Sequence, residues 1–235
     1  MVYVMSDIHG NKARFDNVIE KINLQPEDTL YILGDVIDRF PDGIKLIRRI
    51  MRMPNVKMIL GNHEYMMLNA LYYSVDSTTG NPNQVEQVHQ DKLELWYHNG
   101  GEVTHSYLKR IRKSVRQEIY EFLVGLPLNI HAEVDGQKFL LIHGGVEENY
   151  EAHRCKYDTK TAYAVWARNS HLESIPEDTI LIFGHTPTIH YHEVIPMELW
   201  QCENYINIDC GSGYEFPGRL CCLRLEDGQE FYSDN

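Results

Sequence analysis

The feature that most constrains this chain is a pattern that occurs five times: a short apolar run ends in a small polar cluster. The runs cover residues 2–5, 30–33, 56–60, 139–142 and 180–183, and the clusters cover 6–10, 34–39, 61–64, 143–145 and 184–187. Apolar runs of this length that end at glycine or polar residues are typical of buried strands. The pattern predicts strands that end in side chains able to bind a metal.

Helical periodicity separates the first three runs. Residues 13–22 place Phe15, Val18 and Ile22 on one face, and residues 43–51 repeat this spacing. Alternating strands and helices imply right-handed crossovers and a parallel sheet. In open α/β sheets the ligand site lies at the carboxyl ends of the strands. We therefore expect an α/β fold in which the polar clusters meet at one edge.

The chain is expected to form one domain over residues 1–235, because its length suits a single large α/β domain. The segment at about 64–122 is polar and aromatic, with helical stretches near 65–73, 84–97 and 114–123 and a loop at 76–82. It is predicted to be a helical insertion beside the site.

The C-terminal third returns to strand patterns. Strands at 130–134 and 138–142 flank Asp135-Gly136, which is a strong hairpin signal. Further strands are predicted at 205–208, 220–225 and 230–232. Together these strands predict a second, mixed sheet packed on the first.

The polar clusters contain six candidate metal ligands. They are two carboxylates, three imidazoles and one amide: Asp7, His9, Asp35, Asn62, His143 and His185. Such ligands suit manganese, iron or zinc. Six are too many for one catalytic ion, but they fit two ions ~3.5–4 Å apart that share a bridging carboxylate, for which Asp35 is the central candidate. Such ions would lower the pKa of a shared water and supply hydroxide to attack a phosphate ester.

Three neighbouring residues complete this chemistry. Arg39, four residues after Asp35, can form a bidentate fork with phosphate. His63 follows Asn62 and is placed to protonate the leaving oxygen as a general acid. Asp38 is a candidate to orient that histidine.

The charge restricts the partners. The sequence has 34 acidic and 22 basic residues, a formal net charge of -12. Such a surface repels nucleic-acid backbones and anionic membranes, so neither a long nucleic acid nor a membrane is expected as a partner. A phosphorylated protein or a small phosphate ester is compatible with this charge, because bound metals invert an acidic field locally. No targeting segment is visible and no run approaches the ~20 apolar residues of a membrane span, so a cytoplasmic protein is expected.

The five motifs, in this order, resemble the metallophosphoesterase superfamily and its phosphoprotein phosphatase branch, in particular the compact bacterial and phage enzymes. The resemblance covers nearly the whole chain, and Asn99-Gly100-Gly101 adds to it. It implies a calcineurin-like α-β-β-α sandwich of two mixed sheets flanked by helices, with manganese as the expected metal. It assigns the first metal to Asp7, His9 and Asp35. The second metal is assigned to Asp35, Asn62, His143 and His185. Asp38 and His63 match the acid pair, and Arg39 the phosphate-binding arginine.

Three positions qualify this resemblance. Phage-type relatives carry a second phosphate-binding arginine shortly after a tryptophan, and Val165-Trp166-Ala167-Arg168 resembles that segment, so Arg168 is the candidate. Ser6 and Phe40 replace glycines of the family pattern. No ligand is lost by either change, but the bulky ring of Phe40 bears on the substrate class, because it would narrow the approach to the metals or stack on a substrate.

Three functions are compatible with these residues. The first is a serine/threonine protein phosphatase. The second is a symmetrical diadenosine tetraphosphate hydrolase or another small-nucleotide phosphoesterase; in that hydrolase family alanine usually stands at the position of Asp38, and aspartate often at that of Glu64, so both residues favour the phosphatase. The third is a non-catalytic phosphate-binding protein, which would be expected to lack one or more ligands.

Overall fold

The protein forms two mixed five-stranded sheets in a computed structural model that describes residues 1–74, 85–168 and 170–234. In spatial order the first sheet contains β12 (Glu230–Tyr232), β11 (Cys221–Arg224), β1 (Val2–Met5), β2 (Thr29–Ile32) and β3 (Val56–Met58). The second contains β6 (Asn129–Val134), β7 (Gln137–Ile142), β8 (Thr179–Phe183), β10 (Tyr205–Asn207) and β9 (Trp200–Cys202).

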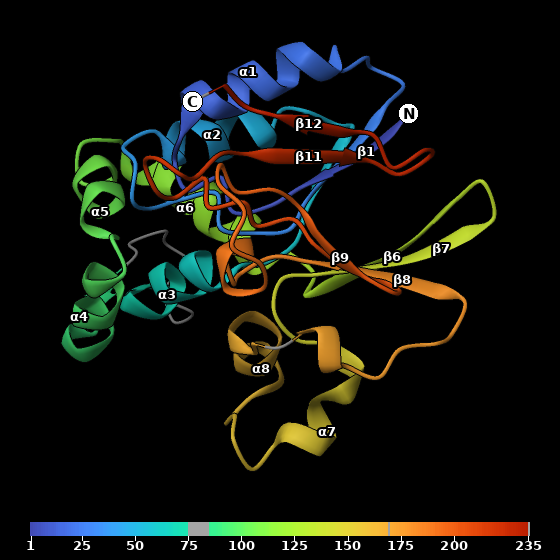
Figure 1. Cartoon of the computed structure of the whole chain (residues 1–235). Coiled ribbons are helices and arrows are strands. Elements are labelled where there is room, and N and C mark those ends of the chain that lie inside the picture. The colour runs from blue at the N-terminus through green and yellow to red at the C-terminus, as the bar shows by residue number, and fades with distance from the viewer. Residues whose placement is uncertain (75–84, 169, 235) are drawn as a thin grey trace.

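Eight α-helices are described. They are α1 (Lys12–Ile22), α2 (Gly43–Ile50), α3 (Asn62–Ala70), α4 (Gln90–His98), α5 (Glu102–Leu108), α6 (Lys113–Val124), α7 (Tyr150–His153) and α8 (Lys160–Trp166). Figure 1 shows α1 and α2 on the outer side of the first sheet, and α7 and α8 beyond the second. The predicted sandwich of two mixed sheets flanked by helices is confirmed.

The alternation of side chains along each strand builds these layers. Val4 of β1 faces the second sheet, where it joins a core with Leu141 and Ile182. Its neighbours Tyr3 and Met5 face the helices on the other side. Successive side chains of a strand point to opposite faces, so one apolar run can serve two cores. This is why the runs are almost continuously apolar.

All five predicted strand runs form strands, and the parallel pairing expected for the first three is confirmed. β1 pairs parallel with β2, and β2 with β3. In the second sheet β7 and β8 are also parallel. The carboxyl ends of parallel strands meet at one edge, so the polar clusters after these strands lie together. The predicted hairpin at Asp135-Gly136 joins β6 to β7, with both turn residues at positive φ.

Two sequence predictions were wrong. The strands β11 and β12 belong to the first sheet and not to the second, because β11 pairs antiparallel with the free edge of β1. The helical stretches predicted at 65–73 and 84–97 are interrupted by β4 (Leu71–Ser74) and β5 (Val85–Val88), which form a two-stranded antiparallel sheet. Aromatic and β-branched residues in both segments favour strands. The loop predicted at 76–82 lies outside the described residues.

In the described part of the chain, no helix is both long and apolar enough to cross a membrane.

Candidate metal centre

The first two polar loops pack directly on each other. The backbone N–H groups of Asp7 and His9 donate to the carbonyls of Gly34, at 3.2 Å, and Asp35, at 2.9 Å. The side chain of Asp7 is held by the Ser6 hydroxyl and by the backbone N–H of His185 at 3.1 Å. Ser6, which replaces a family glycine, therefore orients a candidate ligand.

Backbone strain is concentrated at this edge. Nine described residues other than glycine have a positive φ, and six of these are predicted site residues. They are Asp7 (54°), His9 (52°), Asp35 (53°), Asp38 (72°), Arg39 (64°) and His185 (68°). The left-handed region costs an L-residue about 1–2 kcal/mol. Such residues persist where the surrounding structure over-determines them, which is common at functional sites.

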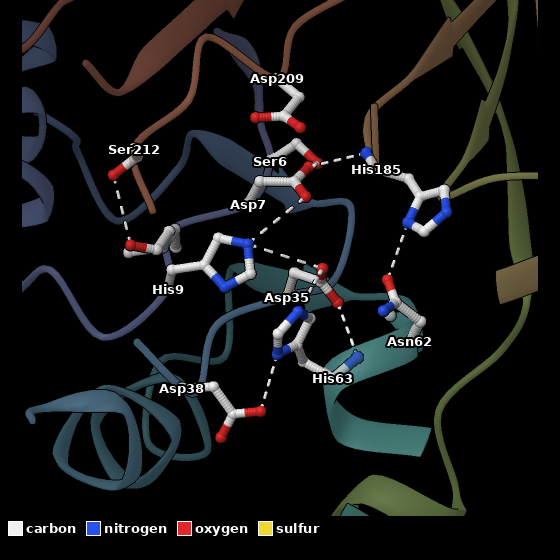
Figure 2. Close-up of polar contacts among 12 residues, drawn as sticks. Ser6, Asp7, His9, Asp35, Asp38, Asn62, His63, His185, Asp209 and Ser212 are labelled. Atoms are coloured by element: carbon white, nitrogen blue, oxygen red, sulfur yellow. Dashed lines mark hydrogen bonds and ion pairs between the residues drawn. The ribbon is translucent and has the colours of Figure 1, made fainter. Parts of the chain in front are cut away.

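Asp35 occupies the centre of the cluster (Figure 2). Its Oδ2 lies 3.7 Å from His9 Nε2 and 3.9 Å from His63 Nε2, while its Oδ1 lies 3.5 Å from His143 Nε2. The two oxygens thus face two different groups of potential ligands, His9–Asp35–His63 and Asp35–His143–His185. This is the arrangement that a bridging carboxylate requires.

Backbone carbonyls set the orientation of two histidines. Nδ1 of His9 lies 3.2 Å from the carbonyl oxygen of Ile37, and Nδ1 of His143 lies 2.7 Å from that of Leu33. A carbonyl only accepts, so each Nδ1 carries the proton, and each Nε2 presents a lone pair to the site. Metal-bound histidines are commonly fixed in this way.

The second group converges on one point. Asn62 Oδ1 lies 2.9 Å from His143 Nε2 and 2.8 Å from His185 Nδ1, although the three residues are far apart in the chain. All three side chains are buried, and His185 Nε2 has no hydrogen-bond partner among the described residues. Donor atoms that converge in this way form a pocket for a cation.

The buried carboxylates of the site also favour the binding of cations. Burial raises the pKa of Asp7, Asp35, Asp38 and Glu64 to about 7, and raises that of Asp209 well above its ordinary value. Carboxylates buried so close together repel one another and are costly without a positive partner. Divalent ions would supply that charge. The donor set and its electrostatics therefore fit two metal ions.

Two glycines allow the loops to approach so closely. A Cβ at Gly61 would lie 2.3 Å from both the backbone nitrogen and Oδ1 of Asp35. A Cβ at Gly184 would lie 2.2 Å from Asp7 Oδ2 and from Ser6 Oγ. No real side chain tolerates such distances, so the glycines that precede Asn62 and His185 are required by packing.

His63 and Asp38 form a buried pair. His63 Nδ1 lies 2.7 Å from Asp38 Oδ2, and Nε2 points toward Asp35. The exposure of the two side chains is 1% and 0%. Burial lowers the pKa of His63 to about 4 and raises that of Asp38 to about 7. The sequence predicts that Asp38 orients His63, and in the structure the two side chains are in contact.

The two candidate phosphate-binding arginines flank the cluster from different sides. The guanidinium of Arg39 lies over the ring of Tyr214 at 4.8 Å and beside His9, where Gly213 leaves room for both side chains. Arg168 is exposed and its Nη1 donates to the hydroxyl of Thr186 at 3.2 Å, next to His185. Phe40 is half-buried and lines a separate groove with Phe216.

Two residues of the site were not assigned a site role from the sequence. Glu64 was used only as a substrate marker, but its carboxylate accepts backbone N–H groups from Asp35 at 2.9 Å, Val36 at 2.8 Å and Ile37 at 3.2 Å. The sequence does not place Trp96 in the metal site, but its indole N–H donates to Asp38 at 2.7 Å. Its position just before Asn99-Gly100-Gly101, a segment already singled out, was the available signal.

Replacing Glu64 with alanine is expected to lower the free energy of unfolding by about 3 kcal/mol, because several buried N–H groups would lose their acceptor. Urea unfolding in the presence of a chelator measures this loss without a contribution from bound metal. Glu64→Gln, which keeps one acceptor oxygen, should lose less. Equal stability of Glu64→Ala and the parent protein would show that the carboxylate does not hold the Asp35 loop.

Comparison with known proteins identifies the family. The calcineurin-like phosphoesterase model matches residues 1–219. The chain belongs to this family. It is 26% identical over 215 residues to serine/threonine-protein phosphatase 2 of Salmonella typhimurium. The aligned region covers 90% of the chain and 87% of that protein.

Other members of the family are named for different substrates. The chain is 28% identical over 153 residues to the symmetrical bis(5'-nucleosyl)-tetraphosphatase of Acidovorax sp., covering 64% of the chain but 46% of that protein. A cold-active protein-tyrosine phosphatase from Shewanella sp. shares the fold with a TM-score of 0.60 at 16% identity, over 99% of the chain and 80% of that structure. The chain is therefore a metallophosphoesterase, and its relatives are named for both protein and nucleotide substrates.

Proposed function

We propose that this metallophosphoesterase is a serine/threonine protein phosphatase that holds two divalent ions, preferably manganese. Asp7, His9 and Asp35 would hold one ion, and Asp35, Asn62, His143 and His185 the other. The convergence of these donors around Asp35 supports this assignment. When bound, the ions would supply the Lewis acidity that activates water and neutralises charge on the phosphoryl group.

The 2.7 Å contact between His63 and Asp38 is the observation that carries the preference for a phosphomonoester. The leaving group of a phosphoserine ester is an alkoxide, which is too basic to depart without a proton. The leaving group of a dinucleotide polyphosphate is itself a phosphate, which departs without such help. A histidine oriented by a buried carboxylate is a suitable general acid for the first reaction, because the negative charge of a bound phosphate ester would offset the lowered pKa of His63 and favour its protonated form. The second reaction does not need such an acid.

The arginines have a supporting role in this proposal. Arg39 and Arg168 stand on different sides of the cluster and offer planar guanidinium groups for the phosphoryl oxygens. Arg39 is stacked on Tyr214, which limits its mobility. A phosphate between the two arginines would be held in a fixed orientation.

A symmetrical dinucleoside tetraphosphate hydrolase is the second candidate, because relatives of that name match the chain. Glu64 no longer separates the two candidates, since its carboxylate binds the Asp35 loop from behind. Asp38 remains the residue that distinguishes them.

A side-by-side turnover assay in manganese, on a phosphoserine peptide and on diadenosine tetraphosphate, tests the proposal. We expect faster hydrolysis of the peptide and no hydrolysis in a chelated control. Faster hydrolysis of the dinucleotide would assign the protein to the nucleotide hydrolases with the same metal site. Tight binding of phosphate without turnover of either substrate would instead indicate a phosphate-binding protein.

A further inference from the structure

A segment of the insertion lies directly behind Asp38 and Arg39. This segment, residues 96–104, runs from the end of α4 through the Asn99-Gly100-Gly101 turn into α5. It makes three hydrogen bonds to the two residues. Arg39 N donates to Gly100 O at 3.1 Å, Asp38 N donates to Thr104 Oγ1 at 3.1 Å, and Trp96 Nε1 donates to Asp38 Oδ2 at 2.7 Å. The insertion thus holds both residues at their positive φ angles.

Of these three hydrogen bonds, the one from Trp96 ends on the carboxylate, to which the Thr104 hydroxyl also lies close. Its indole N–H and His63 Nδ1 share the same oxygen, Asp38 Oδ2, each at 2.7 Å. The other oxygen, Oδ1, has no hydrogen-bond partner among the described residues. Both Trp96 and Asp38 are fully buried, so water does not substitute for the indole. Trp96 is therefore placed to fix the direction in which the carboxylate faces His63.

The turn that follows α4 is shaped around this indole. A Cβ at Gly101 would lie 2.3 Å from Trp96 Nε1. Any larger residue there would displace the nitrogen that donates to Asp38. A tryptophan that served only to fill the core would not need its polar edge aligned with a buried carboxylate, because the N–H of a buried indole can be satisfied by any acceptor.

We propose that Trp96 is a positioning residue for the reaction: its indole N–H locks the Asp38 carboxylate so that His63 presents its proton to the leaving group. This inference rests on the general-acid role of His63 in the proposed function. Trp96 touches neither substrate nor metal and acts through Asp38. The helical insertion is then a working part of the site, since it supplies the third member of a His63–Asp38–Trp96 chain.

The leaving group separates this role from a structural one. Phenyl phosphate has a basic leaving group that needs a proton, whereas 2,4-dinitrophenyl phosphate has an acidic one that does not. For Trp96→Phe in manganese, we expect kcat to fall about 10-fold on phenyl phosphate and less than about twofold on the dinitrophenyl ester. KM and metal content should stay unchanged, because the indole touches neither substrate nor metal.

Two further variants distinguish the loss of the indole N–H from a defect in packing. Replacement of Trp96 by 3-benzothienylalanine keeps the bicyclic shape but exchanges the N–H for sulfur, and the same selective loss is expected. Tyr97→Phe is the matched control, because the Tyr97 hydroxyl pairs with His105 at 2.7 Å in the same insertion without reaching Asp38. Tyr97→Phe should hydrolyse both esters like the parent.

The activity of the His63→Asn enzyme on the two esters distinguishes a failure of the general-acid role of His63 from a failure of the positioning role of Trp96. Selective loss on phenyl phosphate in His63→Asn but not in either Trp96 variant would overturn the role of Trp96 alone. Equal loss on both esters in His63→Asn would overturn the general acid, and the role of Trp96 with it. If both roles hold, adding Trp96→Phe to His63→Asn should cause no further loss, because the two residues act on one proton transfer.

Discussion

The Asp35→Asn protein is expected to lose both metal ions together with its activity. Asp35 presents one oxygen toward His9 and the other toward His143, so an amide would remove the negative charge that both groups share and would leave only one oxygen able to bind an ion. Even outer partners of metal ligands are worth 10–100-fold in metal affinity, so we expect at least about a 100-fold loss for this central carboxylate. Calorimetric titration with manganese and elemental analysis after gel filtration measure it.

Asp28→Asn is a suitable control for this substitution. Asp28 is also buried and stands just before β2, whereas Asp35 stands just after that strand. It binds the N-terminal ammonium group at 2.6 Å and makes no contact with the metal centre. This variant should lose stability but keep both ions. Retention of two ions per chain by Asp35→Asn would show that Asp35 does not bridge them.

The His63→Asn protein is expected to keep both ions and to lose about 10²–10⁴-fold in kcat on an unactivated phosphomonoester, which is the range for a lost general acid. His63 Nδ1 is bound to Asp38, so its Nε2 is the atom left to serve the leaving oxygen. Turnover of a phosphoserine peptide, with metal content measured on the same sample, checks both parts of the expectation.

The metal content matters because His63 also lies within reach of His9 and Asp35. Loss of one ion in His63→Asn would make the histidine a ligand, with Asp38 supporting it from behind as carboxylates often do. Wild-type turnover with both ions bound would instead remove His63 from the chemistry. Asp38→Asn should resemble His63→Asn more weakly, because the imidazole stays in place without its orienting carboxylate.

The position of the candidate ligands followed from local pattern and one rule of topology. Asp7, Asp35 and Asn62 each come directly after an apolar run, and parallel strands bring such positions to the same edge. His143 and His185 follow parallel strands of the second sheet in the same way. The convergence of these residues could be expected from sequence because each depends on its own strand and on a shared strand direction.

Strand partners were predicted less well. The pattern of residues 221–224 indicates a strand, but it does not say which edge the strand will join. That choice depends on the unpaired edge of β1, more than 200 residues away, where Val4 lies opposite Leu223. An exposed edge is unfavourable, and the apolar faces of β11 fit both cores that β1 separates. Pairing between distant segments is decided by the whole packing arrangement.

By itself, the sequence determined the strand-end motifs, the types of the candidate ligands and their order along the chain, because these depend on residue chemistry and short spacings. Only the tertiary structure decided which side chains from elsewhere in the chain contact and support these motifs. The contact of Trp96 with Asp38 spans 58 residues, and the Glu64 carboxylate accepts backbone N–H groups of the Asp35 loop. Such contacts are set by how the insertion packs against the sheet, and no local pattern encodes that packing.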